Sequence, residues 1–176
     1  LFMKMKTLKL LLIGFGVALL ATGCAAGETD IQSKTDSGVM TATSGVEYDW
    51  SDINIQCGTV ERTFSFANDT DEPLYLKGAQ TSCMCTTARY RLPDNSISPK
   101  YGMHDNPGNW GAVIQPGEAF GVEVVFDPLA HGPDATGPIL RSVYLISSDR
   151  NNPVMELKAT GNVLSQDDYL TKYPKP

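Results

Sequence analysis

Two cysteines that are separated by one residue, Cys83 and Cys85, are the pair whose type and spacing most directly suggest chemistry. In an extended strand, residues i and i+2 point to the same side, and their Cα atoms lie about 6.6 Å apart. That separation is near the upper limit for a disulfide, so a bond between the two cysteines is expected to be strained and easily reduced. Alternatively, two thiolates on one side of a strand can hold one metal ion.

The chain has only two histidines, His104 and His131, and both lie in segments that are predicted to be loops. In a β-sandwich, loops that are distant in sequence gather at the two ends of the fold. Cys83, Cys85, His104 and His131 therefore form a tentative metal site. Their sulfur and nitrogen donors suit copper, as Cu(I), or zinc, and the sequence suggests no other cofactor.

The N-terminal segment has the features of an export signal. Its only charges before Cys24 are three lysines, and an uncharged apolar run over residues 10–21 is followed by small residues. That run is too short for a transmembrane helix, which needs roughly 20 residues. Residues 20–24, Leu-Ala-Thr-Gly-Cys, resemble the lipobox of bacterial lipoproteins, which implies a signal peptide over residues 1–23 and lipidation of Cys24. The alternatives are an ordinary signal peptide cut near Ala26 and a retained membrane helix.

The cysteine count leaves the state of the thiols open. Once Cys24 is assigned to the lipid, three of the four cysteines remain, namely Cys57, Cys83 and Cys85. Outside the cytoplasm, an odd number of cysteines cannot all pair within one molecule. A disulfide among these three, a metal site and inert reduced thiols are all consistent with the sequence. Because Cys57 shares a strand face with two isoleucines, we expect it to be a core residue.

Charge limits the class of partner. Without the three N-terminal lysines, 11 basic residues face 20 acidic residues, so the exported form carries a net charge of about −9. Nucleic-acid binding and a polybasic membrane surface both require clustered Lys and Arg, so neither is expected. We expect the membrane to be reached through the N-terminal lipid, and the partner to be an unknown envelope protein or a metal ion.

Patterning predicts one all-β domain. Residues 24–46 are rich in small, hydroxylated and acidic residues and predict a flexible tether. From Tyr48 onward, apolar and polar residues alternate in short runs that turn residues separate, and no segment has a convincing helical period. About seven strands are expected over residues 47–164, followed by a polar C-terminal tail over residues 165–176. The predicted fold is an immunoglobulin-like antiparallel β-sandwich, with a barrel as the main alternative.

Several motifs, in this order, resemble the bacterial family called domain of unknown function 1573. The more specific two are Ser82-Cys83-Met84-Cys85-Thr86 and Pro116-Gly117-Glu118. The others are Cys57-Gly58-Thr59-Val60, Thr63-Phe64-Ser65-Phe66-Ala67-Asn68, Glu72-Pro73-Leu74, Val124-Val125-Phe126-Asp127 and Leu157-Lys158-Ala159-Thr160-Gly161. The resemblance implies an immunoglobulin-like fold but supplies no catalytic residues. Many members have glycine where Met84 stands, and residues 93–112 look like an insertion.

The sequence favours a protein that is not an enzyme, because it has no phosphate-binding loop, nucleophile elbow or helical histidine pair. The leading hypothesis is a lipid-anchored binding or scaffold domain on the periplasmic or cell-surface side of the cell envelope. The second is a periplasmic metal-handling or thiol-redox lipoprotein that uses the Cys-x-Cys motif and the two loop histidines. This second hypothesis requires at least one histidine to lie within reach of Cys83 and Cys85.

Overall fold

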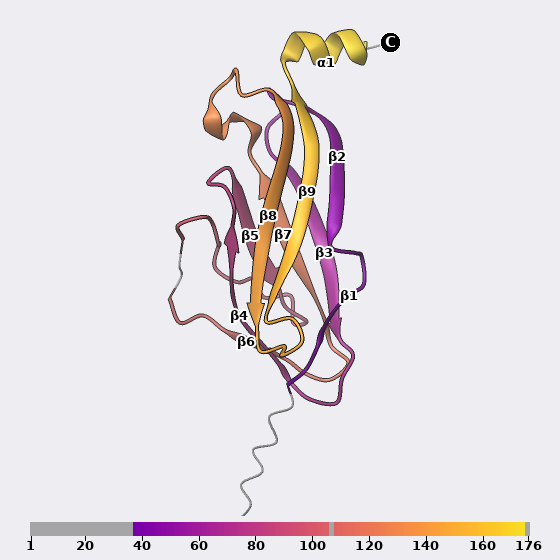
Figure 1. Ribbon diagram of the computed structural model, residues 1–176, viewed down its shortest axis with the longest axis vertical. Helices are drawn as coiled ribbons and strands as arrows, with labels where there is room; N and C mark the ends of the chain where they lie inside the picture. Colours follow the sequence, from indigo (N-terminus) through magenta and orange to yellow (C-terminus); the bar gives the residue numbers. More distant parts are fainter. Residues whose placement is uncertain (1–36, 106–107, 175–176) are drawn as a thin grey trace, which may run out of the picture. The chain divides into compact units, whose positions relative to one another are not determined.

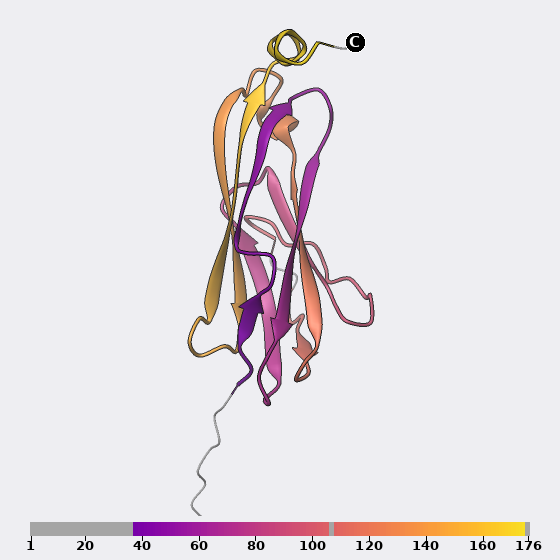
Figure 2. The ribbon, with the colours of Figure 1, turned by 90° about the vertical axis from the view of Figure 1, so that its right-hand side faces the viewer.

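Period-two alternation of apolar and polar side chains is what builds the two sheets of this protein. The computed structural model describes residues 37–105 and 108–174, and these residues form nine strands. One sheet has the order β1 (Met40–Ala42), β3 (Val60–Asn68), β7 (Ala119–Phe126) and β5 (Thr86–Arg91). The other has the order β2 (Glu47–Asn54), β9 (Val154–Leu164), β8 (Gly137–Ser147), β4 (Leu74–Thr81) and β6 (Ala112–Ile114). Figures 1 and 2 show the two sheets as facing layers.

The core lies between the two layers and is built from the inward-facing side chains. Phe64 and Phe66 on β3, Val122 and Val124 on β7 and Leu145 on β8 are each at most 1% exposed. Burying a side chain of this size contributes about 1.5–3 kcal/mol, so the alternating positions supply much of the driving force for folding. The sandwich predicted from the alternation is therefore confirmed, and it is preferred to a barrel.

One strand pairing departs from the expected antiparallel arrangement. β2 runs parallel to β9, with Glu47 opposite Lys158 and Asn54 opposite Leu164. The register shifts between Asp49 and Asp52, at the point where the backbone of Ser51 has a φ of 58°. Because β2 is an edge strand far from β9 in sequence, no turn dictates its direction. The other strand pairs of the described residues are antiparallel.

The first strand, β1, lies within the segment that the sequence assigns to the tether. Met40 to Ala42 form β1, which pairs antiparallel with β3, and the Met40 side chain is 2% exposed. The Met40 backbone N–H donates to the buried carboxylate of Asp149 at 3.0 Å. The burial of the Met40 side chain and the hydrogen bond of its backbone N–H stabilise β1, although the residues around it are mostly polar.

The predicted polar tail contains a helix. α1 (Gln166–Lys172) begins after Ser165, whose hydroxyl accepts a hydrogen bond from the Asp168 backbone N–H at 3.1 Å. Its C-terminal end contacts β2, where Asp52 forms an ion pair with Lys172 and accepts a hydrogen bond from the Tyr173 hydroxyl at 2.9 Å. Over the described part of the chain, no helix has the length and apolarity needed to cross a membrane.

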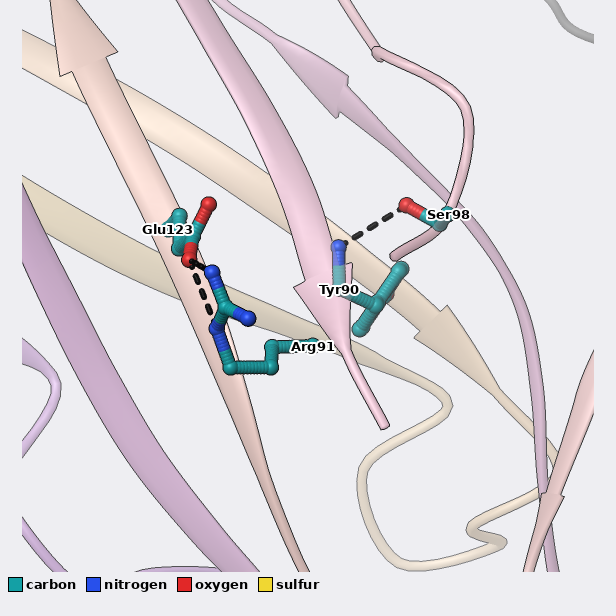
Figure 3. Close-up of polar contacts among 4 residues, drawn as sticks. All are labelled: Tyr90, Arg91, Ser98 and Glu123. Atoms are coloured by element: carbon teal, nitrogen blue, oxygen red, sulfur yellow. Dashed lines mark hydrogen bonds and ion pairs between the residues drawn. The ribbon is translucent and has the colours of Figure 1, made fainter. Parts of the chain in front are cut away.

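Polar contacts hold β5 on both of its sides. Arg91 forms an ion pair with Glu123 on β7, and the Tyr90 backbone N–H donates to the Ser98 hydroxyl at 2.9 Å (Figure 3). Ser98 belongs to the predicted long connection, which folds back along β5 instead of extending away from it. Within that connection, Trp110 stacks on the Tyr90 ring with a centroid distance of 5.3 Å. The connection therefore covers the free edge of the four-stranded sheet.

Candidate functional site

The Cys-x-Cys motif lies in the turn between β4 and β5, not in an extended strand. The Thr86 backbone N–H donates to the Cys83 carbonyl at 3.1 Å and closes the turn. The two cysteine Cα atoms are consequently 5.3 Å apart, and the two sulfur atoms form a disulfide. The separation of about 6.6 Å expected from the sequence was wrong, because it assumed extended backbone. A Cα distance of 5.3 Å is ordinary for a disulfide.

Neighbouring side chains fix this turn. The buried Thr81 hydroxyl contacts two carbonyl oxygens, those of Cys83 at 2.9 Å and Thr86 at 3.0 Å. Ser82 and Ser142 join the turn to β8, since the Ser82 N–H donates to the Ser142 carbonyl and the Ser82 hydroxyl accepts from the Ser142 N–H, each at 2.9 Å. The cysteine positions are therefore set by β4 and β8 as well as by the turn itself.

The two sulfur atoms have different surroundings. Cys85 is 3% exposed and packs in a small apolar cluster with Ile53, Phe126 and Val163. Cys83 lies at the rim of the same cluster and is only half-buried. A reagent from solvent can therefore reach Cys83, whereas Cys85 is shielded by the core.

His131 lies beside Cys83. It ends the short 3-10 helix η1 (Pro128–His131), and its Nε2 is 3.2 Å from Cys83 Sγ. Asp127 places this helix, because its backbone N–H donates to the Cys85 carbonyl at 2.9 Å and its carboxylate accepts from the Leu129 N–H at 2.9 Å. The same residue therefore links the cysteine turn to the helix that carries His131. Figure 1 shows η1 and the β4–β5 turn at the same end of the sandwich.

Arg141 on β8 lies beside Cys85. Its Nε donates to Cys85 Sγ at 3.1 Å, and its guanidinium lies over the Phe126 ring at 5.3 Å from the centroid. Partial burial lowers the pKa of Arg141, but an arginine side chain stays charged in proteins. A positive charge near sulfur favours the thiolate over the thiol. The site therefore combines two sulfurs with an imidazole on one side and a guanidinium on the other.

The predicted site residues are only partly brought together. The ligand atoms of Cys83, Cys85 and His131 all lie within 4.8 Å of one another. His104 does not belong to this group, because the connection that carries it folds back along β5, where His104 lines a surface hollow with Tyr101 and Lys77.

Cys57 does not belong to the group of Cys83, Cys85 and His131. Cys57 is exposed, so its expected role as a core residue is wrong. β2 ends at Asn54, and a turn closed by the Cys57 N–H on the Asn54 carbonyl at 3.1 Å breaks the strand alternation before Cys57 is reached. Cys24, the predicted lipidation residue, and the predicted signal peptide lie outside the described residues.

Sequence reasoning missed Arg141, although a signal for it is present. Arg141 shares its strand parity with Ile139, Val143 and Leu145, so it takes an inward-facing position on β8. A basic residue at such a position needs a polar or anionic partner inside the fold. That pattern predicts a buried acceptor, but only the three-dimensional structure identifies it as Cys85.

Comparisons with known proteins support the fold and the family. A solved structure of a protein of unknown function from Porphyromonas gingivalis W83 is 19% identical, with a TM-score of 0.53. The aligned region covers 73% of this chain and 48% of that protein, so this chain spans about half of its length. The ASH/PapD-like domain 7 of human CEP192 is 9% identical over 73% of this chain and 87% of that one, with a TM-score of 0.45. Likenesses at these identities concern the fold alone.

Among curated proteins, none matches the chain with significant similarity. The family described as "Protein of unknown function (DUF1573)" matches residues 41–100. This segment runs from β1 through the Cys83–Cys85 turn and β5, and it contains several of the motifs on which the family resemblance was based. The resemblance to this family that the sequence motifs predict is thereby confirmed: residues 41–100 match the DUF1573 family model.

Proposed function

We propose that this protein is a thiol–disulfide exchange protein of the bacterial cell envelope, with Cys83 and Cys85 as its redox pair. The observation that supports this best is that each sulfur has its own polar partner, His131 at 3.2 Å from Cys83 and Arg141 at 3.1 Å from Cys85. The Arg141 guanidinium is a cationic group next to a cysteine, and such a group stabilises the thiolate, which is the reactive form.

A mainly structural role for this disulfide is energetically weak. The two cysteines are two residues apart, so the bond closes a very small loop. Loop-closure entropy then accounts for about 1.5 kcal/mol of stabilisation, against about 3 kcal/mol for a 15-residue loop. The fold gains little from this bond, whereas a disulfide with one sulfur within reach of solvent, here Cys83, can be opened by an incoming thiol.

The different exposure of the two sulfurs gives the exchange a direction. A thiolate of a dithiol partner protein attacks Cys83 Sγ, the S–S bond breaks, and Cys85 leaves as a thiolate beside Arg141. Cys83 is then joined to the partner's first cysteine in a mixed disulfide. The partner's second thiolate attacks the sulfur of that first cysteine and releases Cys83 as a thiolate. The partner loses two electrons and becomes a disulfide, and this protein gains them. Transfer of the same two electrons to a protein disulfide completes the cycle.

The proposal keeps the location predicted from the sequence. Lipidation at Cys24 would hold the protein at the membrane, and a flexible tether of about 15 residues before β1 would give it a root-mean-square reach of about 20 Å. The envelope is also a compartment in which disulfides form and persist. The binding or scaffold role stays the alternative, and it predicts partner capture that does not depend on Cys83 and Cys85.

A thiol count at defined redox potential tests the proposal. The full chain is solubilised in detergent with Cys24 and Cys57 replaced by serine, so that Cys83 and Cys85 are the only thiols. It is equilibrated with mixtures of reduced and oxidised dithiothreitol, and free thiols are alkylated and counted by mass. We expect two thiols to appear together and to disappear again on reoxidation. A pair that remains bonded in excess dithiothreitol, or that does not re-form its bond, refutes the exchange function.

A further inference from the structure

We infer that the reduced form of this site binds Cu(I) in preference to Zn²⁺, with Cys83, Cys85 and His131 as its ligands. The inference rests on the proposed reversibility of the Cys83–Cys85 bond, because only the reduced sulfurs can bind a metal ion. The three ligand atoms already lie within 4.8 Å of one another. Thiolate sulfur is the soft donor that Cu(I) prefers, and imidazole suits both copper and zinc.

The number of ligands is the first argument for copper. The described residues supply three ligand atoms at this site. Zn²⁺ in proteins is almost always four-coordinate and would need a water or another group in the fourth position. Three protein ligands, two of them thiolates, satisfy Cu(I) without a solvent ligand, whereas Zn²⁺ bound by the same three would keep a water as its fourth ligand.

Charge balance is the second argument, and Arg141 decides it. Two thiolates and Cu(I) have a net charge of −1, and the guanidinium of Arg141, 3.1 Å from Cys85 Sγ, brings the site to neutrality. Two thiolates and Zn²⁺ are already neutral, so the charge of Arg141 would be left without a partner. An unbalanced charge in a partly buried site is costly. The carboxylate of Asp127 is engaged in capping η1 and is not one of the three grouped ligands.

Exposure of the ligands makes the site reachable. His131 is exposed and Cys83 is half-buried, so an ion enters from solvent on their side and meets Cys85 last. Any thiol that is protonated before binding releases its proton to solvent. The ion remains Cu(I) throughout, so the step requires neither an oxidant nor a reductant.

A chelator competition tests the site. The Cys24→Ser, Cys57→Ser full chain in detergent is reduced, freed of reductant without oxygen, and titrated into the coloured Cu(I) complex of bicinchoninate. We expect one Cu(I) per chain, tighter binding of Cu(I) than of Zn²⁺, and loss of binding in Cys83→Ser and in Cys85→Ser. His131→Ala is expected to weaken Cu(I) binding, and His104→Ala serves as the matched control that leaves it unchanged.

Arg141→Gln tests the charge argument separately. Outer groups of a metal site typically contribute 10- to 100-fold in affinity, so we expect a loss of about that size for Cu(I) and none for Zn²⁺. A thiol count on the same samples separates the two proposals. A protein with two free thiols that does not compete for Cu(I), or that binds Zn²⁺ more tightly, overturns this inference alone. A protein whose Cys83–Cys85 bond cannot be reduced overturns the exchange function as well.

Discussion

At the scale of single residues, the two cysteines of one short motif are made unequal by their neighbours. Cys85 is buried against Phe126 and accepts a hydrogen bond from Arg141, whereas Cys83 is half-buried and lies beside His131. A thiolate that forms at Cys85 keeps a charge partner in an apolar setting. Cys85 is therefore suited to be the leaving sulfur, and Cys83 to be the sulfur that is attacked.

Replacing Arg141 with glutamine should shift the redox equilibrium toward the disulfide. The substitution removes a hydrogen bond to a charged sulfur, for which about 1.5–3 kcal/mol is typical, and partial exposure of Arg141 reduces that figure. We expect a change of about tenfold in the equilibrium constant with dithiothreitol, since 1.4 kcal/mol corresponds to tenfold. Alkylation and mass analysis of equilibrated samples measure it.

Arg89→Gln is the matched control, because Arg89 is an exposed arginine on β5, the strand that follows the cysteine turn. Arg89→Gln should leave the redox equilibrium with dithiothreitol unchanged from that of the parent protein. Equal shifts in the two variants would mean that net charge, and not the contact with Cys85, sets the stability of the reduced form.

Loss of the disulfide should have a small effect on stability. We expect Cys83→Ala/Cys85→Ala to lower the free energy of unfolding by about 1.5 kcal/mol through loop entropy, with a further contribution from the lost packing of Cys85. Denaturant unfolding of the parent and of the double variant measures the difference. A loss of 5 kcal/mol or more would instead assign the bond a structural role, since that is the upper end for native disulfides.

At the scale of elements, Asp127 connects the cysteine turn to η1. Its carboxylate caps the helix by accepting from the Leu129 N–H, and removal of such a cap typically costs about 1 kcal/mol. We expect Asp127→Ala to release His131 from Cys83 and to weaken Cu(I) binding as His131→Ala does, while the thiol count stays at two. Asp134→Ala, at an exposed acidic residue just after η1, is the control. If Cu(I) affinity is unchanged in Asp127→Ala, the cap does not position His131.

Strands with a long run of alternating apolar and polar residues could be predicted from the sequence. Elements that depend on contacts with distant residues could not. β3, β7, β8 and β9 follow the predicted runs because one face of each packs on the core. β1 was missed because three residues carry no measurable period, and its partner β3 lies more than 20 residues away. α1 was missed because it has no buried face, although Ser165 and Asp168 are spaced as a helix start.

The candidate site was predictable in the same partial way. Loop clustering suggests a histidine near the cysteines, and His131 lies 3.2 Å from Cys83, but the sequence cannot distinguish His131 from His104. The distinction depends on the path of a long connection that bridges to β5 at Tyr101. Arg141 lies on β8, in the sheet that does not contain β5, and it contacts Cys85 from there. Because the two residues are far apart in sequence, no local motif predicts this contact.

Docking of α1 on β2 should weaken in acid. The ion pair with Lys172 is the main cause that lowers the pKa of Asp52, and hydrogen bonds from Asn162 and Tyr173 add to it. The pKa of Asp52 is lower when α1 is docked than when it is free. The contact therefore stabilises docking fully at pH values above the ordinary aspartate pKa of about 3.9. This stabilisation is lost as the pH falls through the pKa that Asp52 has in the docked state. Amide hydrogen exchange of α1 as a function of pH detects this loss of docking.

Asp52→Asn should abolish the pH dependence of α1 exchange. Asp71→Asn, at an exposed loop residue, should preserve it.

At the scale of the whole molecule, the sandwich positions the proposed redox site at one of its ends. One fold hosts many unrelated functions, so the fold alone does not assign a function to this chain. What distinguishes this chain is that the β4–β5 turn, η1 and β8 meet around two sulfur atoms. None of these three elements alone points to a function. Their combination around the two sulfur atoms is what favours the proposed thiol exchange over partner binding.

The remaining prediction concerns where the whole molecule resides. If Cys24 is lipidated, the full chain should partition into the membrane fraction, because each buried methylene of an acyl chain contributes about 0.8 kcal/mol and several chains give stable anchoring. Cys24→Ser should abolish incorporation of a labelled fatty acid and move the chain out of that fraction. Cys57→Ser is the control, since it removes an exposed thiol and leaves the lipobox intact. A Cys24→Ser chain that stays in the membrane would favour a retained apolar segment over lipidation. In either case the Cys83–Cys85 thiol count should not change, because the redox proposal depends on the described domain and not on its anchor.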